Sequence, residues 1–357
     1  MTAALDTALG PIREQVLAAA RGGGRLRIRG AGTKDFLGHA LDGELLDTRS
    51  IAGVVDYEPS ELVVTARAGT RLAELDALLG AHGQMLAFEP PAFGGDPTLG
   101  GIVAAGLAGP RRASAGSVRD FVLGVRMLNS AGDLVGFGGR VMKNVAGFDV
   151  ARLMCGSLGI LGLVVEASLK VRPRPAIEAT LAFEHGEAAA IEAMNHWSRQ
   201  PLPLSATSWY DGVTRVRLSG VEPAVAAAHA ALGGARLPAD EAARFWAGLK
   251  DHAHPFLAPR TPLWRVSVPA TATPFALPGA TLHEWAGALR WVRTAAPSEA
   301  VRDAARRAGG SAALWHGDGD GSAFEPLAPA VLALHRRLKQ AFDPRGIWNP
   351  GRLVPGL

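Results

Sequence analysis

The stretch "PTLGGIVAAGLAG", residues 97–109, tells most about the fold of this chain. It is uncharged and contains four glycines, and two arginines follow it after Pro110. A membrane-spanning helix needs about 20 apolar residues, so this run is too short to be one. Gly100 and Gly101 lead into an apolar segment that predicts a short helix, and main-chain N–H groups in such a place can bind phosphate oxygens. The alternative is that the glycines only allow close packing.

Composition bounds the class of protein. The 357 residues are 48% hydrophobic and 20% charged, which predicts a globular protein with a large core and two domains. Cys155 is the only cysteine, so neither an internal disulfide nor a cysteine-built zinc or iron–sulfur site is expected. Asp6 and Arg13 lie where a signal peptide would need an unbroken apolar core. We therefore expect a cytoplasmic protein that binds no metal.

Positive charge concentrates in one part of the chain. The net charge is +4, but residues 97–174 alone hold ten Lys and Arg against four Asp and Glu. A solvated basic face and a nucleic-acid surface are two explanations. Only 6% of residues are aromatic, and no helix-turn-helix or zinc-finger pattern is present in the sequence. We therefore expect no nucleic-acid partner, and a discrete anionic ligand explains the cluster better.

The predicted elements change in character near Pro173 and Pro175. Before these prolines the pattern predicts an α/β arrangement, which includes a helix over 11–20 that Pro11 opens. After them, residues 179–234 predict the order β-α-β-β-α, which is typical of a split ferredoxin-like unit. The C-terminal tail is too rich in Pro and Gly to form a helix. The predicted domains are residues 1–174, residues 175–341 and the tail, 342–357.

Two common nucleotide-binding motifs are absent from the sequence. Residues 30–38, "GAGTKDFLG", supply Gly30 and Gly32 but not the third glycine that opens the helix of a Rossmann unit. No G-x-x-x-x-G-K-[ST] sequence is present, which excludes a P-loop. Three separate glycine-rich turns remain, and their exposed amides can together bind an anion. These turns span residues 30–34, 98–109 and 156–162.

These turns and their surroundings resemble a known flavoprotein family. The motifs are "RIRGAGTK", "PTLGGIVAAGLAG", "AGSVRDFVLGVRML", "AGFDVARLMCGSLGILGLVVEASLKV" and the terminal "FDPRGIWNPGRL". They are similar to the FAD-binding domain of vanillyl-alcohol oxidase-type flavoproteins, also called PCMH-type. When "VMKNVAGFDVARLM", "PLWRVSVP" and "WAGALRW" are added, nearly the whole chain resembles the FAD-binding E subunits of bacterial glycolate oxidases.

The resemblance implies a fold and a cofactor. The fold is α+β, with a PCMH-type FAD-binding domain of two subdomains, a smaller ferredoxin-like α+β cap, and a tail that returns to the flavin site. The cofactor is FAD. Many relatives attach it covalently through a histidine in the first loop, but this loop has Thr33, Lys34 and Asp35 instead. Cys155, close to an apolar strand, is expected to be an inert core residue, so we expect FAD to be held non-covalently.

The resemblance also assigns cofactor contacts position by position. The first loop wraps the pyrophosphate with Gly30, Ala31, Gly32, Thr33 and Lys34. The second loop and its continuation beneath the flavin contribute Pro97, Thr98, Gly100, Gly101, Gly106, Ala108 and Gly109. The next turn and the third segment contribute Gly116, Ser117, Asp120, Gly156, Ser157, Gly159, Gly162 and Val164. In the tail, Asn349 matches the residue that returns to the isoalloxazine side.

No catalytic set is assigned. The larger dehydrogenase subunits of this superfamily carry an H-x-G-D-G-N-x-H segment, and "WHGDGDGSAF" keeps its first part, residues 316–319, but lacks the later histidine. His316 is a candidate base, and the alternative is an exposed loop histidine. Arg265 and Arg290, in predicted strands, are candidate carboxylate clamps. The alternative for both arginines is packing against the neighbouring Trp side chains.

The resemblance implies a function. The chain is expected to be the FAD-binding subunit of a glycolate oxidase or dehydrogenase complex, which oxidises glycolate to glyoxylate. Its expected partners are a larger FAD-linked subunit and an iron–sulfur subunit, and any contact with the inner membrane is peripheral and through them. Arg111 and Arg112 are expected to face solvent or a partner. Two alternatives stay open: a non-catalytic FAD-containing assembly subunit, and a stand-alone dehydrogenase for a 2-hydroxy acid such as lactate.

Overall fold

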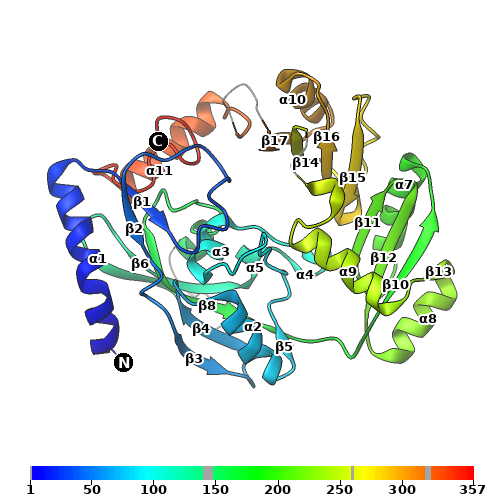
Figure 1. Ribbon diagram of the computed structural model, residues 1–357, viewed down its shortest axis with the longest axis horizontal. Helices are drawn as coiled ribbons and strands as arrows, with labels where there is room; N and C mark the ends of the chain where they lie inside the picture. Colours follow the sequence, from blue (N-terminus) through cyan, green and yellow to red (C-terminus); the bar gives the residue numbers. More distant parts are fainter. Residues whose placement is uncertain (1, 140–147, 259–260, 318–322) are drawn as a thin grey trace.

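The chain forms two units, each of mixed helices and strands, that lie side by side along its longest axis (Figure 1). The computed structural model describes residues 2–139, 148–258, 261–317 and 323–357. The N-terminal part and the C-terminal end of the chain form the first unit, and the residues between them form the second, which we call the cap. Within the described ranges, no helix has the length and apolar character needed to cross a membrane.

A five-stranded antiparallel sheet is the centre of the first unit. In spatial order its strands are β3 (Val54–Glu58), β4 (Val63–Arg67), β8 (Leu163–Lys170), β6 (Val122–Leu128) and β7 (Leu134–Gly138). Every residue of β8 except the last is buried. Val164 faces a core that contains helices α2 (Leu72–Ala81) and α3 (Leu99–Ala105). Val165 faces a second core on the other side of the sheet, so β8 is buried on both faces and is apolar along most of its length.

Helix α1 (Thr2–Gly22) is longer than predicted. The sequence predicted a helix over 11–20 opened by Pro11, because proline lacks the N–H that an interior helix position donates. This prediction is wrong: the helix passes through Pro11 and begins nearer the N-terminus. Leu9 and Val16 lie on one face of the helix and are fully buried in the core beside β1 (Leu26–Arg29). This apolar contact extends to the N-terminal side of Pro11, which accounts for the longer helix.

The C-terminal tail joins the first unit next to β1. Strands β1 and β2 (Glu44–Asp47) form a small parallel sheet, and Trp348 forms a parallel bridge with Leu26 of β1. The Asn349 N–H donates to the Leu26 carbonyl at 3.0 Å, and the Leu26 N–H donates to the Ile347 carbonyl at 2.8 Å. The tail therefore returns to the edge of the first unit that carries the first glycine-rich loop, as the family resemblance implied.

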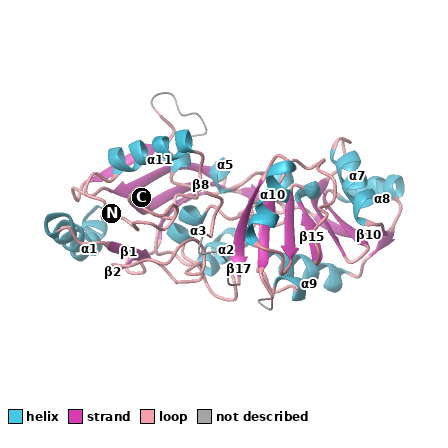
Figure 2. Ribbon diagram, turned by 90° about the horizontal axis from the view of Figure 1, so that it is seen from above, coloured by secondary structure: helices cyan, strands magenta, loops and turns pink. Residues whose placement is uncertain are grey.

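Helix α11 (Pro329–Phe342) also lies over the first unit, which Figures 1 and 2 both show. Leu338 packs against the core of that unit, and Lys339 Nζ donates to the Ile160 carbonyl at 2.7 Å. The predicted boundary placed all residues up to 341 in the cap. Because the buried contacts of α11 are with the first unit, the chain returns to it earlier than predicted, and we propose that α11 belongs to the FAD-binding part.

The cap is built on one eight-stranded antiparallel sheet. In spatial order its strands are β13 (Ala235–Arg236), β10 (Ile177–Glu184), β12 (Val213–Gly220), β11 (Leu204–Tyr210), β15 (Ala280–Glu284), β16 (Leu289–Arg293), β14 (Leu263–Ser267) and β17 (Ser311–His316). The first half has the ferredoxin-like strand order 4-1-3-2 and carries helices α7 (Glu187–Ser198) and α8 (Glu222–Leu232). This half confirms the predicted ferredoxin-like unit.

The second half of the cap sheet repeats the same strand order, from β17 through β14 and β16 to β15. Helix α10 (Ser298–Arg307) corresponds to α8, whereas the irregular residues 268–279 take the place of the first helix. Pairing of β11 with β15 joins the two halves. The repeat is one of topology, since the sequence shows no internal repetition.

One face of the cap sheet packs against the first unit. Leu263 and Leu289 lie on this face, in a core that also holds Leu107 and Leu158 of the first unit. Helices α7, α8 and α10 cover the opposite face. Successive residues of a strand point to opposite faces of a sheet, so the register of the cap strands decides which side chains reach the space between the units.

Candidate flavin site

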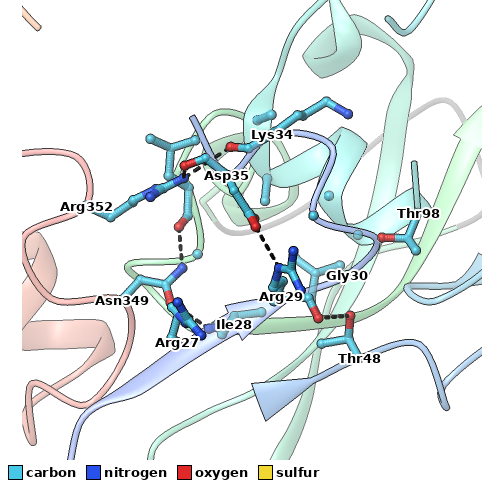
Figure 3. Close-up of a pocket in the computed structure, with 18 of the residues that line it drawn as sticks. Arg27, Ile28, Arg29, Gly30, Lys34, Asp35, Thr48, Thr98, Asn349 and Arg352 are labelled. Atoms are coloured by element: carbon cyan, nitrogen blue, oxygen red, sulfur yellow. Dashed lines mark hydrogen bonds and ion pairs between the residues drawn. The ribbon is translucent and has the colours of Figure 1, made fainter. Parts of the chain in front are cut away.

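A cavity of about 340 Å³ lies in the first unit, between its glycine-rich turns (Figure 3). Four segments form its walls: the loop after β1, the start of α3, the residues that precede and open β8, and the C-terminal tail. These segments are far apart in the sequence, and the fold brings them to one place. We call this space the flavin cavity.

Fourteen of the twenty-one predicted cofactor residues line the flavin cavity. They are Gly30, Ala31, Gly32, Thr33, Lys34, Pro97, Thr98, Gly100, Gly101, Ser157, Gly159, Gly162, Val164 and Asn349. All three glycine-rich turns are represented, so one ligand can contact all of them. The contact of each residue with FAD stays a prediction.

The first two glycine turns touch each other at Gly30 and Thr98. A Cβ on Gly30 would lie 2.2 Å from Thr98 Oγ1, which no side chain can accommodate unless the threonine moves. Gly32 has a φ of +77°, a left-handed conformation that glycine adopts without strain. Glycine is therefore required at both positions by the shape of the loop, before any ligand is considered.

The second turn presents main chain to the cavity at the start of α3. Gly100 packs against Ala68, whose Cβ would be 2.8 Å from a Cβ on this glycine. A Cβ on Gly101 would meet only Thr98 Oγ1, at 3.4 Å, and Gly101 lines the cavity. Gly100 is thus a packing glycine, whereas Gly101 leaves space in which a ligand can approach the main chain.

Asn349 ties the tail to two walls of the cavity. Its Oδ1 accepts a hydrogen bond from the Ile28 N–H at 2.8 Å, and its Nδ2 donates to the Leu158 carbonyl at 2.7 Å. A Cβ on Gly159 would lie 2.8 Å from this Nδ2, so the glycine is needed for the close approach. Asn349 itself is almost fully buried, and its side chain links β1 to the third glycine segment.

Arg352 holds the first loop from the tail side (Figure 3). Its guanidinium donates to the carbonyls of Lys34 at 3.1 Å, Asp35 at 2.9 Å and His39 at 2.9 Å. Arginine suits this task because its planar guanidinium carries five N–H donors. Arg352 belongs to the tail motif "FDPRGIWNPGRL", but the sequence alone gives no sign of this role, because the carbonyls it binds are more than 300 positions earlier.

Positive charge exceeds negative charge around the flavin cavity. Arg27, Arg29, Lys34 and Arg352 line it, and Asp35 is the acidic residue among its described lining residues. Asp35 is paired with Arg29, whose Nε lies 2.7 Å from the carboxylate. Burial lowers the pKa of the Lys34 ammonium to about 8. An anion in the cavity would compensate these cations.

The residues present fit FAD. Thr98 Oγ1 and Arg27 Nε are buried polar atoms that have no hydrogen-bond partner within the described part of the chain. Such atoms are costly unless a ligand or water satisfies them. The pyrophosphate of FAD supplies acceptor oxygens and two negative charges, which suits these donors and the surplus of cations. The glycines leave room for it at the main chain.

Among the described residues, no side chain that lines the flavin cavity is suited to covalent attachment of FAD. Neither a histidine nor a cysteine is among its described lining residues. Cys155 lies elsewhere in the first unit, and burial raises the pKa of its thiol to about 12. A thiol that stays protonated is a poor nucleophile.

Seven predicted cofactor residues lie outside the flavin cavity. Gly106 and Gly156 line a neighbouring cavity of about 390 Å³ between the first unit and the cap, which we call the inter-unit cavity. Ala108 and Gly109 line a cavity of about 20 Å³, which we call the small cavity. Gly116, Ser117 and Asp120 line none of these three cavities. Asp120 Oδ2 instead accepts hydrogen bonds from the Ser117 N–H and hydroxyl, which caps the short helix α5 (Val118–Phe121).

The inter-unit cavity adjoins the flavin cavity. Ala105 and Leu158 line both spaces. Its cap wall includes Arg265, Ser267 and Ser311 from strands β14 and β17. A small polar molecule in this space would therefore lie between the flavin cavity and the cap sheet.

Register separates the two candidate arginine clamps. Arg265 of β14 is paired with Trp291 of β16, and Arg290 of β16 is paired with Val266 of β14. Arg265 and Arg290 thus point to opposite faces of the sheet. Arg265 lines the inter-unit cavity. Arg290 is fully buried on the other face, where its guanidinium donates to backbone carbonyls, including that of Thr273 at 2.6 Å, and stabilises the irregular segment.

His316 is half-buried and lies at the end of β17, beside the first unit. Its ring centroid is 5.1 Å from that of Phe36, and burial lowers its pKa. It is not among the residues that line the inter-unit cavity. Two neighbours in the predicted motif, Asp318 and Gly319, lie outside the described residues. The structure therefore places His316 in an aromatic contact between the units rather than on an exposed loop.

The prediction that Arg111 faces solvent or a partner is wrong. Arg111 is 8% exposed and lies between the units, where its guanidinium pairs with Glu178 of the cap. Glu89 accepts from the Arg111 N–H at 2.8 Å and pairs with Arg217 of the cap at 2.8 Å. The two acidic side chains offset the burial of both arginines, which the sequence could not reveal because these residues are distant along the chain.

Comparison with known proteins agrees with this geometry. The family described as "FAD binding domain" matches residues 11–138, and the family described as "FAD linked oxidases, C-terminal domain" matches residues 276–353. A solved structure of alkyldihydroxyacetonephosphate synthase has the same fold, with a TM-score of 0.65 over 96% of this chain and 75% of that chain at 15% identity.

Among curated proteins, the glycolate oxidase subunit GlcE of Escherichia coli is 46% identical over 332 residues, which are 93% of this chain and 93% of that protein. The glycolate oxidase subunit GlcD of Bacillus subtilis is 33% identical over 140 residues, which are 38% of this chain and 29% of that protein. The chain therefore belongs to the FAD-linked oxidase family, and within it to the group of the glycolate oxidase subunit GlcE.

Proposed function

We propose that this chain is the FAD-binding subunit of a glycolate oxidase complex, in which glycolate is oxidised to glyoxylate. The observation that carries the proposal is the identity of 46% to a glycolate oxidase subunit over nearly the whole length of both chains. The flavin cavity, with its unsatisfied donors and its surplus of cations, supports it. The expected partners are a larger FAD-linked subunit and an iron–sulfur subunit, since this chain has a single cysteine. The complex is expected in the cytoplasm, with any membrane contact through the partners.

FAD is held non-covalently in this proposal. The fourteen predicted residues that line the flavin cavity contact it, and Arg27 and Thr98 satisfy their free donors on its pyrophosphate. FAD, when bound, supplies the acceptor for the hydride that leaves the α-carbon of a 2-hydroxy acid. The protein supplies a place for the substrate next to that acceptor.

The inter-unit cavity is the proposed substrate site. It adjoins the flavin cavity, and Arg265 is a cation on its cap wall. No ion pair of Arg265 within 4 Å occurs among the described residues. Burial and the charge of Arg112 lower its pKa to about 10, and the charge of Glu284 opposes this shift. A guanidinium that lacks a close ion-pair partner suits a carboxylate ligand. Glu325, an acid that lines the same cavity, is already paired with Arg306 at 2.8 Å, so we assign no general base.

The experiment is to purify the chain alone, measure its bound FAD, and mix it anaerobically with glycolate. Bleaching of the flavin absorbance shows turnover without partners. Flavin that glycolate reduces only after the partner subunits are added supports the complex and places the chemistry in the assembly. No reduction by glycolate in either sample contradicts the proposed substrate.

A matched pair of variants tests the substrate site. Arg265→Met is expected to keep its bound FAD. Its affinity for glycolate is expected to fall at least tenfold, because a charged hydrogen bond contributes about 1.5–3 kcal/mol. Arg290→Met is expected to lower the thermal stability instead, because it leaves buried carbonyls without donors. Equal losses of glycolate affinity in the two variants contradict the assignment of Arg265.

A further inference from the structure

Arg265 lines two adjoining spaces of different size. One is the inter-unit cavity of about 390 Å³, which is the proposed substrate site. The other is the small cavity of about 20 Å³, which Glu284 also lines. The small cavity has room for about one water molecule, so no substrate fits there. A charge on Glu284 and a charge in the inter-unit cavity therefore both act on the same guanidinium.

Glu284 is a buried carboxylate without a close countercharge. It is 4% exposed, and no ion pair within 4 Å joins it to another residue of the described ranges. Its Oε1 accepts a hydrogen bond from Trp291 Nε1 at 2.8 Å. Burial raises its pKa to about 7, while Trp291 and the charge of Arg265 oppose the shift. Glu284 therefore changes between its neutral and its ionised form near neutral pH.

The backbone keeps Glu284 in this position. It is the last residue of β15, and the next residues, Trp285 and Ala286, have φ angles of 55° and 57°. Such left-handed angles are unfavourable for residues with a side chain, and they persist where the surroundings enforce them. Here the Ala286 N–H donates to Thr207 Oγ1 at 2.9 Å, and Trp285 Nε1 donates to the Gly109 carbonyl at 3.1 Å. The main chain that follows Glu284 is therefore held in place, and the hydrogen bond from Trp291 Nε1 holds the carboxylate.

We propose that Glu284 and Arg265 form a proton-linked pair, so that a carboxylate ligand bound to Arg265 from the inter-unit cavity is matched by protonation of Glu284. The inference rests on the proposed function, since it uses Arg265 as the carboxylate clamp. The ligand anion takes over the positive charge that stabilised ionised Glu284. It also adds a second negative charge next to the same guanidinium, and both effects favour the neutral acid.

The other charged groups around Glu284 do not replace this pairing. Glu89 of the first unit and Arg217 of β12 also act on it, but they are paired with each other at 2.8 Å. Lys250 lines the small cavity, and its Nζ lies 3.0 Å from Asp251 Oδ1. His252 lines the same cavity, and burial lowers its pKa to about 3. His252 therefore stays neutral over the range in which Glu284 titrates.

The sign of the pH dependence follows from linkage. When ligand binding takes up a proton, affinity decreases as the pH rises above the pKa of the free group. Carboxylate affinity is therefore expected to be constant below about pH 6 and to fall by up to about tenfold per pH unit above about pH 7. Glu284→Gln removes the titrating group and keeps an uncharged hydrogen-bonding side chain of similar shape.

The test is calorimetric titration of the FAD-loaded protein with oxalate, an unreactive two-carbon carboxylate that stays ionised across this range. Measurement in two buffers of different ionisation enthalpy gives the protons taken up on binding. The unmodified chain is expected to take up a proton at about pH 8, and its affinity is expected to fall with pH. In Glu284→Gln both effects are expected to vanish. Glu192→Gln, which alters an exposed acid of α7 on the opposite face of the cap sheet, is the matched control and is expected to keep both.

A second variant covers the case in which Glu284→Gln does not fold. The N–H of Trp291 donates to Glu284 and stabilises the ionised carboxylate. Trp291→Phe removes this donor and so raises the pKa of Glu284, and the midpoint of proton uptake is expected to move to higher pH. Oxalate binding without proton uptake, or uptake that persists in Glu284→Gln, overturns the inference while the glycolate reaction of the proposed function still stands. No oxalate binding at all overturns the inference together with the assignment of Arg265.

Discussion

Gly30 and Thr98 are in such close contact that a Cβ on Gly30 would lie 2.2 Å from Thr98 Oγ1. This contact joins the first two glycine-rich turns, and both residues line the flavin cavity. The Thr98 hydroxyl has no hydrogen-bond partner in the part of the chain that the structure describes. Moving it aside would therefore disturb a donor that the proposed FAD ligand uses.

Gly30→Ala is expected to lose most of its bound FAD. The added methyl group forces Thr98 or the first loop to shift, and overpacking of this kind typically costs about 1–3 kcal/mol. The measurement is the ratio of flavin absorbance to protein in the purified variant. Gly136→Ala is the control, because a Cβ at this strand position meets no atom within 4 Å. A variant Gly30→Ala with full flavin content contradicts the assigned loop contact.

Arg352→Met is expected to weaken FAD binding and to leave the fold intact. The arginine donates to three carbonyls of the first loop, and its loss frees the loop on the side of the tail. The readouts are the FAD dissociation constant from flavin fluorescence and the melting temperature of the flavin-free protein. Arg345→Met changes an exposed arginine of the same tail and is expected to bind FAD normally. If both variants bind FAD equally well, the tail does not order the loop.

Lys339→Met is expected to destabilise the whole protein by about 3–5 kcal/mol. Lys339 Nζ lies 2.6 Å from Asp343 Oδ2 and also donates to the carbonyls of Ile160 and Trp348. Asp343 is buried, so the variant leaves an uncompensated charge under the tail. The measurement is urea unfolding, with Lys339→Met/Asp343→Asn as the companion variant. The companion is expected to recover part of the loss, and a single variant as stable as the parent would contradict the ion pair.

FAD affinity is expected to decrease as the pH rises through about 8. Burial lowers the pKa of Lys34 to about 8, and an anionic ligand in the flavin cavity favours the charged ammonium, so binding above this pH takes up a proton. The stability of the flavin-free protein changes in the opposite direction. Because the unfolded chain keeps the lysine proton to higher pH, that stability is expected to rise between about pH 8 and the ordinary lysine pKa.

Lys34→Gln tests the origin of this pH dependence. The variant is expected to bind FAD more weakly at neutral pH and to show little change between about pH 7 and about pH 9.5, because the titrating group is gone. Lys170→Gln, at a lysine outside the flavin cavity, serves as the control. A slope that is the same in Lys34→Gln and in the parent chain assigns the pH dependence to another group.

The glycine turns were predictable because their chemistry is local. Gly32 is required by its own φ of +77°, Gly100 and Gly101 are neighbours at the start of one short helix, and a sequence reveals such segments directly. The ferredoxin-like half of the cap was also predictable, since its strands and helices follow one another along the chain. Pattern and spacing suffice for elements that pair with their neighbours.

Other features depend on contacts between distant residues, which pattern does not reveal. Arg265 and Arg290 looked equivalent until the pairing of β14 with β16 placed them on opposite faces of the sheet. Arg111 looked like a surface arginine until the cap brought Glu178 to it. Arg352 acts on residues more than 300 positions earlier in the chain. Each of these outcomes required the register or the path of the chain in three dimensions.

The most direct test of the central claim is the flavin content of the purified chain. The protein is denatured with acid, and flavin is measured in the supernatant and in the precipitate. A stoichiometric amount of FAD, released entirely into the supernatant, is the result that we predict, because no histidine or cysteine is among the described residues that line the flavin cavity. A chain that folds but binds no FAD, or flavin that stays with the precipitated protein, would contradict the account.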